Sequence, residues 1–177
     1  MSRWPILRTC LPALCVLLSA CSPALDWREL APEGSRLRLQ FPCKPSVHAR
    51  KLQLAGQPVE LTLLACEANA ATWALGWADG VNPAYMGEAL SQLRVSAAAN
   101  IGAVPGTLQV RIVPGATPHE QAGRARVRGQ RPDGSNVTQE VLVFAYGLRI
   151  YQATVLASRM DEAAVDQFFD SVRVAGS

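Results

Sequence analysis

The five cysteines of this 177-residue chain are the residues whose chemistry most needs an explanation. Cys10, Cys15 and Cys21 lie close to the start, whereas Cys43 and Cys66 lie farther along the chain. A cysteine can form a disulfide, bind a metal, act in redox chemistry or carry a lipid, and compartment and spacing decide among these uses. An odd total leaves at least one cysteine without an internal partner.

The N-terminal residues indicate the compartment. Arg3 and Arg8 give a positive start, and residues 9–20 carry no charge, which is the pattern of a secretory signal. As a helix, those twelve residues would extend roughly 18 Å against a hydrocarbon core of roughly 30 Å, so they are too short to span a bilayer. We predict that residues 1–20 are a signal peptide.

The signal ends in Leu18-Ser19-Ala20-Cys21, which resembles a bacterial lipobox. The resemblance implies that Cys21 becomes the mature N-terminus and carries a diacylglyceryl group, usually with a further acyl chain, which is enough to anchor a protein firmly. Ser22 resembles the default signal for sorting to the outer membrane, which would place the domain on the periplasmic side. The alternative is ordinary cleavage after Ala24, which would release a soluble protein.

Removal of the signal leaves Cys43 and Cys66 as an even pair in an oxidising compartment, where we expect a disulfide. The closed loop of 24 residues would contribute about 3.4 kcal/mol to the free energy of unfolding. A metal or redox pair is the alternative. However, Cys43 and Cys66 do not have a C-x-x-C spacing, and the two histidines, His48 and His119, stand 71 residues apart. We therefore expect no metal and no cofactor.

Arg124, Arg126 and Arg128 have the spacing of side chains on one face of a strand, with Ala125 and Val127 on the other. Guanidinium groups suit phosphate or carboxylate, so this is a candidate anion-contact face for lipid headgroups, glycans or an acidic protein. The alternative is an ordinary solvated face, because arginine supplies 15 of the 17 cationic side chains.

Motifs of known enzyme sites are missing from the sequence. It has no G-x-S-x-G, H-E-x-x-H, phosphate-binding loop or dinucleotide fingerprint, and no partner motif accompanies His48 or His119. We therefore expect no catalytic residue and no enzyme. A net charge of +3 is too small to indicate a nucleic-acid partner.

Hydrophobic periodicity predicts the elements that must position these residues. Residues 21–35 are interpreted as a lipidated N-terminus and tether, and residues 36–177 as a single globular α+β domain. The domain is expected to hold an antiparallel meander of about six to eight strands packed with two main helices. The strands expected in the meander are 36–41, 51–54, 59–65, 73–78, 108–112, 122–130, 136–146 and 149–158, and residues 172–174 are expected as a short final edge strand. One helix should begin at Asn82 and end at Gly102, and a second should follow Ser158 as its cap.

This element order resembles the PsbP-like α/β/α sandwich superfamily, which includes extrinsic photosystem subunits and a Ran-binding protein of the Mog type. Two strings carry the resemblance, Ile150-Tyr151-Gln152 and Gln167 to Val174. It implies a non-enzymatic binding or assembly module with a protein partner in the envelope. The alternative is a ligand-binding protein that uses the arginine face or a helix–sheet cleft near Trp73, Trp77 and Tyr85.

Overall fold

A seven-stranded antiparallel sheet forms the centre of the molecule in the computed structural model, which describes residues 25–175. The strand order is β3-β4-β5-β9-β8-β7-β6. The strands are β3 (Ser46–Leu54), β4 (Gln57–Ala68), β5 (Ala71–Ala78), β6 (Gln109–Val110), β7 (Gly123–Gln130), β8 (Asn136–Tyr146) and β9 (Arg149–Ala157). The sheet therefore consists of two meanders, β3-β4-β5 and β6-β7-β8-β9, joined where β5 pairs with β9.

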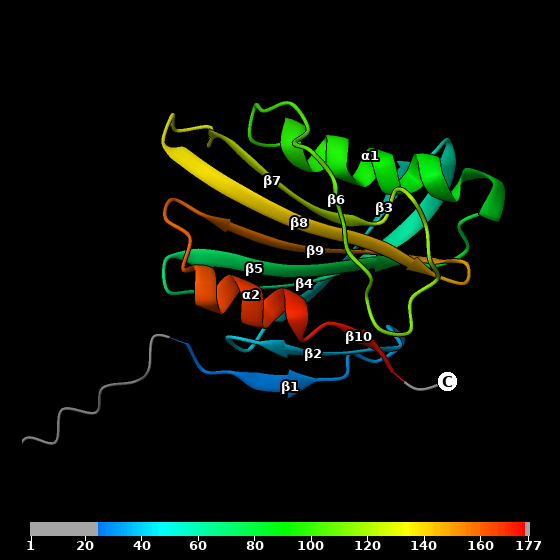
Figure 1. Ribbon diagram of the computed structural model, residues 1–177, viewed down its shortest axis with the longest axis horizontal. Coiled ribbons are helices and arrows are strands. Elements are labelled where there is room, and N and C mark those ends of the chain that lie inside the picture. The colour runs from blue at the N-terminus through cyan, green and yellow to red at the C-terminus, as the bar shows by residue number, and fades with distance from the viewer. Residues whose placement is uncertain (1–24, 176–177) are drawn as a thin grey trace, which may run out of the picture.

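Two further layers cover the faces of this sheet. The helix α1 (Met86–Ala99), preceded by the short 3-10 helix η1 (Pro83–Tyr85), lies on one face. The helix α2 (Glu162–Asp170) lies on the other face, beside a small sheet of β1 (Arg28–Leu30), β2 (Leu37–Phe41) and β10 (Arg173–Val174) (Figure 1). The expected α+β class, with two main helices and a largely antiparallel sheet, is confirmed.

The sequence signals for α1 correspond to its structure. Asn82 Oδ1 accepts a hydrogen bond from the Ala84 backbone at 3.0 Å, and Pro83 begins η1. Gly102 has φ +63°, and the Ala103 N–H bonds back to the Ala98 carbonyl at 3.0 Å, which closes the helix. One apolar stripe of the segment is buried, formed by Met86, Leu90, Leu93, Ala97 and Ile101.

The helix α2 builds the larger core. Phe168 meets the rings of Phe41 and Trp73 edge to face, with centroids 5.4 Å from each. The predicted cap Ser158 is wrong. Helix α2 is capped three residues later by Asp161, whose Oδ1 atom accepts a hydrogen bond from the Ala164 N–H. Strand β8 serves both cores, because alternate residues face α2 (Leu142, Phe144) and α1 (Val143, Ala145).

The tether expected over residues 21–35 is wrong for Arg28–Leu30, which form β1. This strand pairs antiparallel with β2, so that Arg28 lies opposite Phe41 and Leu30 opposite Leu39. Leu25, Trp27 and Leu30 pack against the α2-side core, and the rings of Trp27 and Trp73 lie 6.0 Å apart. These apolar side chains hold the segment on the domain. The sequence did not predict this strand, because three residues are too few to show a strand period.

The strand expected over residues 108–112 is reduced to the two residues of β6. Only Gln109 and Val110 pair with β7, and Val110 and Ile112 are 72% and 83% exposed. Because this segment lies at the outer edge of the sheet, the alternation of Leu108, Val110 and Ile112 does not bury one side of it. Residues 111–122 continue as a loop along the same edge, with Thr117 bridged to Ala145.

Candidate functional site

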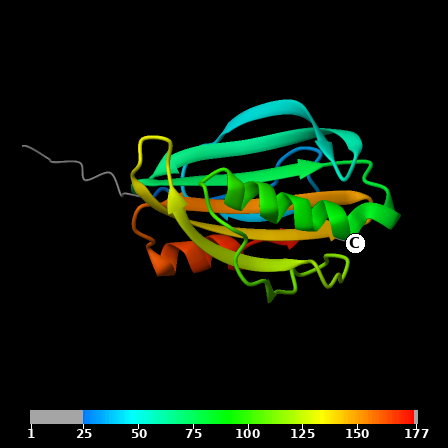
Figure 2. The same cartoon turned by 90° about the horizontal axis from the view of Figure 1, so that it is seen from above.

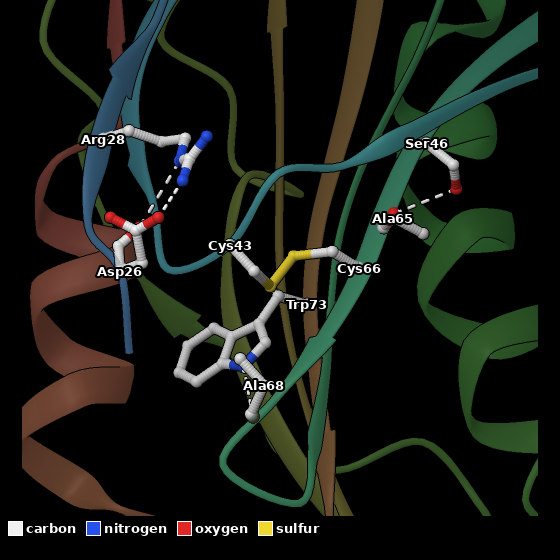
Figure 3. Close-up of a disulfide and its surroundings, with 8 residues drawn as sticks. All are labelled: Asp26, Arg28, Cys43, Ser46, Ala65, Cys66, Ala68 and Trp73. Atoms are coloured by element: carbon white, nitrogen blue, oxygen red, sulfur yellow. Dashed lines mark hydrogen bonds and ion pairs between the residues drawn. A yellow bond between two sulfur atoms is a disulfide. The ribbon is translucent and has the colours of Figure 1, made fainter. Parts of the chain in front are cut away.

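The predicted disulfide between Cys43 and Cys66 is present, with the two Cα atoms 6.1 Å apart (Figure 3). Cys43 follows β2 and Cys66 lies in β4, opposite Trp73 of β5. The indole N–H of Trp73 donates to the Ala68 carbonyl at 3.1 Å. The bond therefore links the small sheet to the main sheet beside the aromatic core, and its two sulfur atoms are not available as metal ligands.

The predicted lipid-attachment residue Cys21 and the signal peptide lie outside the described residues, so they stay predictions. The described chain begins at Leu25, whose side chain packs against the α2-side core.

The arginine stripe lies on β7 with the predicted alternation. Ala125 packs with Ala97 and Val141 beneath α1, whereas Arg124 and Arg126 project toward α2. Strand register places Arg126 opposite Glu140 of β8. On α2, Glu162 and Asp166 are one turn apart, so both carboxylates can face β7.

Arg124 and Arg126 are bound by the protein's own carboxylates. Glu140, which is 4% exposed, forms ion pairs with both arginines, the one to Arg126 at 2.6 Å. Asp166 lies 2.9 Å from Arg124, and Glu162 binds Arg126 through two hydrogen bonds of 2.9 and 2.5 Å. The Arg124 guanidinium also lies 4.6 Å from the centroid of the Phe169 ring.

This arrangement sets the electrostatics of the stripe. The paired hydrogen bonds from Arg126 hold the pKa of Glu162 below its usual value, and Glu162 with Glu140 raises the already high pKa of Arg126. Two guanidinium groups meet three carboxylates, so an anionic ligand would have to compete with Glu140, Glu162 and Asp166. The sequence signals for this network are the four-residue spacing of Glu162 and Asp166 and the hairpin register that places Arg126 opposite Glu140.

Arg128 has a different environment from the other two arginines of the stripe. It is exposed and forms no ion pair within residues 25–175. Together with Arg131 it lines an open depression of about 610 Å³, whose other polar side chains are Asn100, Gln130 and Asn136. No carboxylate lines this depression.

The aromatic cleft expected near Trp73, Trp77 and Tyr85 is wrong. Trp73 and Trp77 are buried in the α2-side core, whereas Tyr85 is 47% exposed in η1, which leads into α1 on the opposite face. The alternation of side chains along β5 turns the two tryptophans away from α1. A cavity of about 390 Å³ lies elsewhere, between residues 110–122 and Phe144.

The two histidines do not form a site together. His48 lies on the exposed strand β3 with its Nε2 atom 3.1 Å from Ser46 Oγ, and His119 Nδ1 accepts from the Gln121 backbone at 3.0 Å. Within residues 25–175, no three side chains of His, Cys, Asp or Glu are grouped to hold a metal. No helix in that part of the chain is both long and apolar enough to cross a membrane. Comparison of the chain with protein-family models and with curated proteins finds no match.

Proposed function

We propose that this protein is a lipid-anchored protein of the cell envelope whose domain serves as a non-enzymatic binding or assembly module. The pairing of Cys43 with Cys66 carries the proposal, because structural disulfides persist in oxidising compartments outside the cytoplasm. This agrees with the signal pattern and lipobox that end at Cys21. The anchor would lie in the outer membrane, with the domain on the periplasmic side.

The order of layers supports a PsbP-like sandwich for residues 36–175. Helix α1, the main sheet, and α2 with the small sheet are stacked in that order (Figure 1). The two strings that resemble the superfamily occupy the core. Tyr151 is buried and donates to the Ser35 carbonyl at 2.8 Å, and Phe168, Phe169 and Val172 pack beneath the sheet.

The segment 110–122 supports a binding role. Val110 and Ile112 are exposed large apolar side chains at the rim of the 390 Å³ cavity, whose wall includes Val113, Ala122 and Phe144. Exposed apolar side chains beside a cavity are typical of interaction surfaces. A protein partner would cover these two side chains and fill the cavity with an apolar side chain of its own.

Acylation tests the anchor directly. Cys21→Ala should abolish labelling of the protein by a clickable palmitate analogue in cells, whereas Cys15→Ala, in the segment removed with the signal, should leave labelling intact after processing. Unchanged labelling of Cys21→Ala would contradict the lipid anchor.

Binding is tested on the same surface. Ile112→Asp should abolish co-purification of a stoichiometric envelope protein, and Val47→Asp, which places the same charge at a 66% exposed position on β3, should preserve it. The size of the cavity also favours a second candidate, a small apolar ligand. In that case native mass spectrometry would show a retained small molecule and no protein partner.

A further inference from the structure

One end of the long axis of the molecule gathers the start of the described chain and three chain reversals. Leu25 lies at the same end as the β4–β5 turn, the β7–β8 turn and the connection from β9 to α2 (Figures 1 and 2). Trp27 contacts Trp73 near the start of β5, and Asn69 of the β4–β5 turn hydrogen-bonds Asp161 before α2 at 3.4 Å. We call this surface the anchor end, defined by Leu25 and residues 69–70, 131–135 and 158–161.

The reach of the chain limits how far this end can lie from a lipidated Cys21. Four residue steps separate Cys21 from Leu25, and a fully extended chain covers at most roughly 14 Å in that distance. Strand β8 alone, with 11 residues, extends about 35 Å along the same axis. A lipid on Cys21 therefore brings the anchor end to the bilayer surface and leaves the β8–β9 turn, at residues 147–148, well away from it.

The depression lined by Arg128 and Arg131 also lies at this end, because Arg131 begins the β7–β8 turn. Arg131 Nη1 donates to Ser158 Oγ at 3.0 Å, which joins the turn to the β9–α2 connection. Arg128 and Arg131 make no ion pair among the described residues, and the rest of the lining consists of three amide residues with Ile101, Pro132 and two glycines. The site therefore offers hydrogen-bond donors and positive charge, which suit phosphate.

We infer that the anchor end is a membrane-docking surface, in which Arg128 and Arg131 bind the phosphate groups of the bilayer that holds the lipid of Cys21. The inference rests on the proposed anchor and deepens it. It fixes which end of the domain meets lipid, and it leaves Val110, Ile112 and the cavity beside them for the partner.

Spin labels at the two ends of β8 test the orientation. The variant Ser135→Cys places one exposed thiol in the turn before β8, and the variant Leu148→Cys places one in the turn after it. In the mature protein no other thiol is free once Cys21 is acylated and Cys43 is bonded to Cys66. The lipidated protein is reconstituted into phosphatidylcholine vesicles that contain phosphatidylglycerol and a nickel-chelating lipid. We expect strong paramagnetic relaxation at residue 135 and little at residue 148.

The contribution of the arginines is measured in a variant with twelve glycine and serine residues inserted after Pro23, because a longer tether lets docking become an equilibrium. Each arginine at an anionic bilayer surface raises the docked-to-undocked ratio roughly five-fold. The double variant Arg128→Gln, Arg131→Gln should therefore lower this ratio roughly 25-fold. The matched control, Arg36→Gln with Arg50→Gln, removes two other exposed arginines and should leave the ratio unchanged.

Equal relaxation at residues 135 and 148, or equal ratios for the two double variants, would overturn the docking inference. The mass of the mature protein separates this result from failure of the anchor. Absence of an acyl mass on Cys21 contradicts the proposed function itself, whereas equal relaxation in a protein with that mass contradicts only the docking surface.

Discussion

Glu140 shows how one buried charge organises its surroundings. It lies in an apolar strand, yet its carboxylate is held by Arg124 and Arg126, whose remaining donors meet Asp166 and Glu162. A buried ion pair of this kind contributes little net stability compared with an apolar replacement, but loss of one partner leaves a buried charge without compensation. Arg124 and Arg126, two of the three arginines in the predicted anion-contact face, therefore bind carboxylates that hold α2 against β7 and β8.

Replacement of Glu140 should therefore be costly. Glu140→Gln should lower the free energy of unfolding by about 3 kcal/mol, because Arg124 is only 12% exposed and loses its buried partner. Urea unfolding followed by tryptophan fluorescence measures this. The control Glu162→Gln removes a carboxylate that is 59% exposed and should cost less than about 1 kcal/mol. Similar losses for both variants would show that Glu140 does not organise the network.

The Glu162–Arg126 pair should give a small acid dependence. The pKa of Glu162 is lower in the folded protein, because Arg126 donates to it, than in the unfolded chain, where glutamate titrates near about 4.3. The stabilisation is therefore complete above that pH and is lost as the pH falls through the folded pKa. Urea midpoints of the wild type and Glu162→Gln should differ by a constant amount above about pH 5 and converge as the pH falls through the lowered pKa of Glu162 in the folded protein. A difference that grows toward low pH would contradict this assignment.

Elements with local periodicity or capping signals could be predicted from the sequence, whereas features that depend on long-range packing could not. Helix α1 has a cap at Asn82, a buried stripe and a left-handed Gly102, and each signal is local. Strand β1 has three residues, too few for a period that would predict it. Strand β6 keeps only two residues of the segment expected over 108–112, because it lies at an edge where the alternation buries nothing. The strand expected over residues 172–174 is present as β10. The pairing of β2 with β10, and the contact of α2 with Arg124 and Arg126, depend on tertiary packing that no local pattern encodes.

The junction between the end of α1 and β7 depends on the absence of a side chain at Gly129. A Cβ atom there would lie 2.1 Å from the Ile101 carbonyl oxygen, which also accepts the Gln130 N–H at 2.8 Å. Gly129→Ala should therefore lower the free energy of unfolding by about 2 kcal/mol, because α1 must move away from the strand. Thermal unfolding measures the loss.

Gly76→Ala is the matched control for this junction. Its Cβ would meet Leu61 Cδ1 at 3.5 Å, an ordinary van der Waals contact in an extended strand, so stability should be unchanged or slightly higher. If Gly129→Ala were as mild as Gly76→Ala, the close approach of Ile101 would not limit the packing of α1.

At the scale of the whole molecule, the small sheet is fixed to the main sheet by the α2-side core and by one covalent bond. The disulfide joins the segment after β2 to β4, and Gln40 and Ser171 add a hydrogen bond of 2.8 Å between β2 and the end of α2. The disulfide and this hydrogen bond both lie on the α2 side of the main sheet. Their loss should therefore affect the attachment of the small sheet more than the attachment of α1.

Removal of the disulfide should lower stability without changing the fold. The double variant Cys43→Ala, Cys66→Ala should lose about 3 kcal/mol of unfolding free energy, because the unfolded chain regains the freedom of the closed loop. Urea unfolding with and without dithiothreitol measures it. Reductant should shift the wild-type midpoint to that of the double variant and should leave the double variant unaffected. A wild-type midpoint that does not respond to complete reduction would contradict a stabilising bond.

In the export that we propose for this chain, the pairing of β2 with β10 would determine when the domain can be completed. Residue 37 lies opposite residue 174, and the Ala175 N–H donates to the Arg36 carbonyl at 2.8 Å, so the first and last elements of the domain form one sheet. A chain that crosses a membrane N-terminus first has Leu37, Leu39 and Phe41 outside before α2 and β10 arrive to cover them. In the proposed periplasmic location, these apolar residues would until then be available to a chaperone or to another unfinished chain. The bond between Cys43 and Cys66 lies within the first part of the domain, so it can form in that interval and covalently tie the segment after β2 to β4 before α2 and β10 arrive.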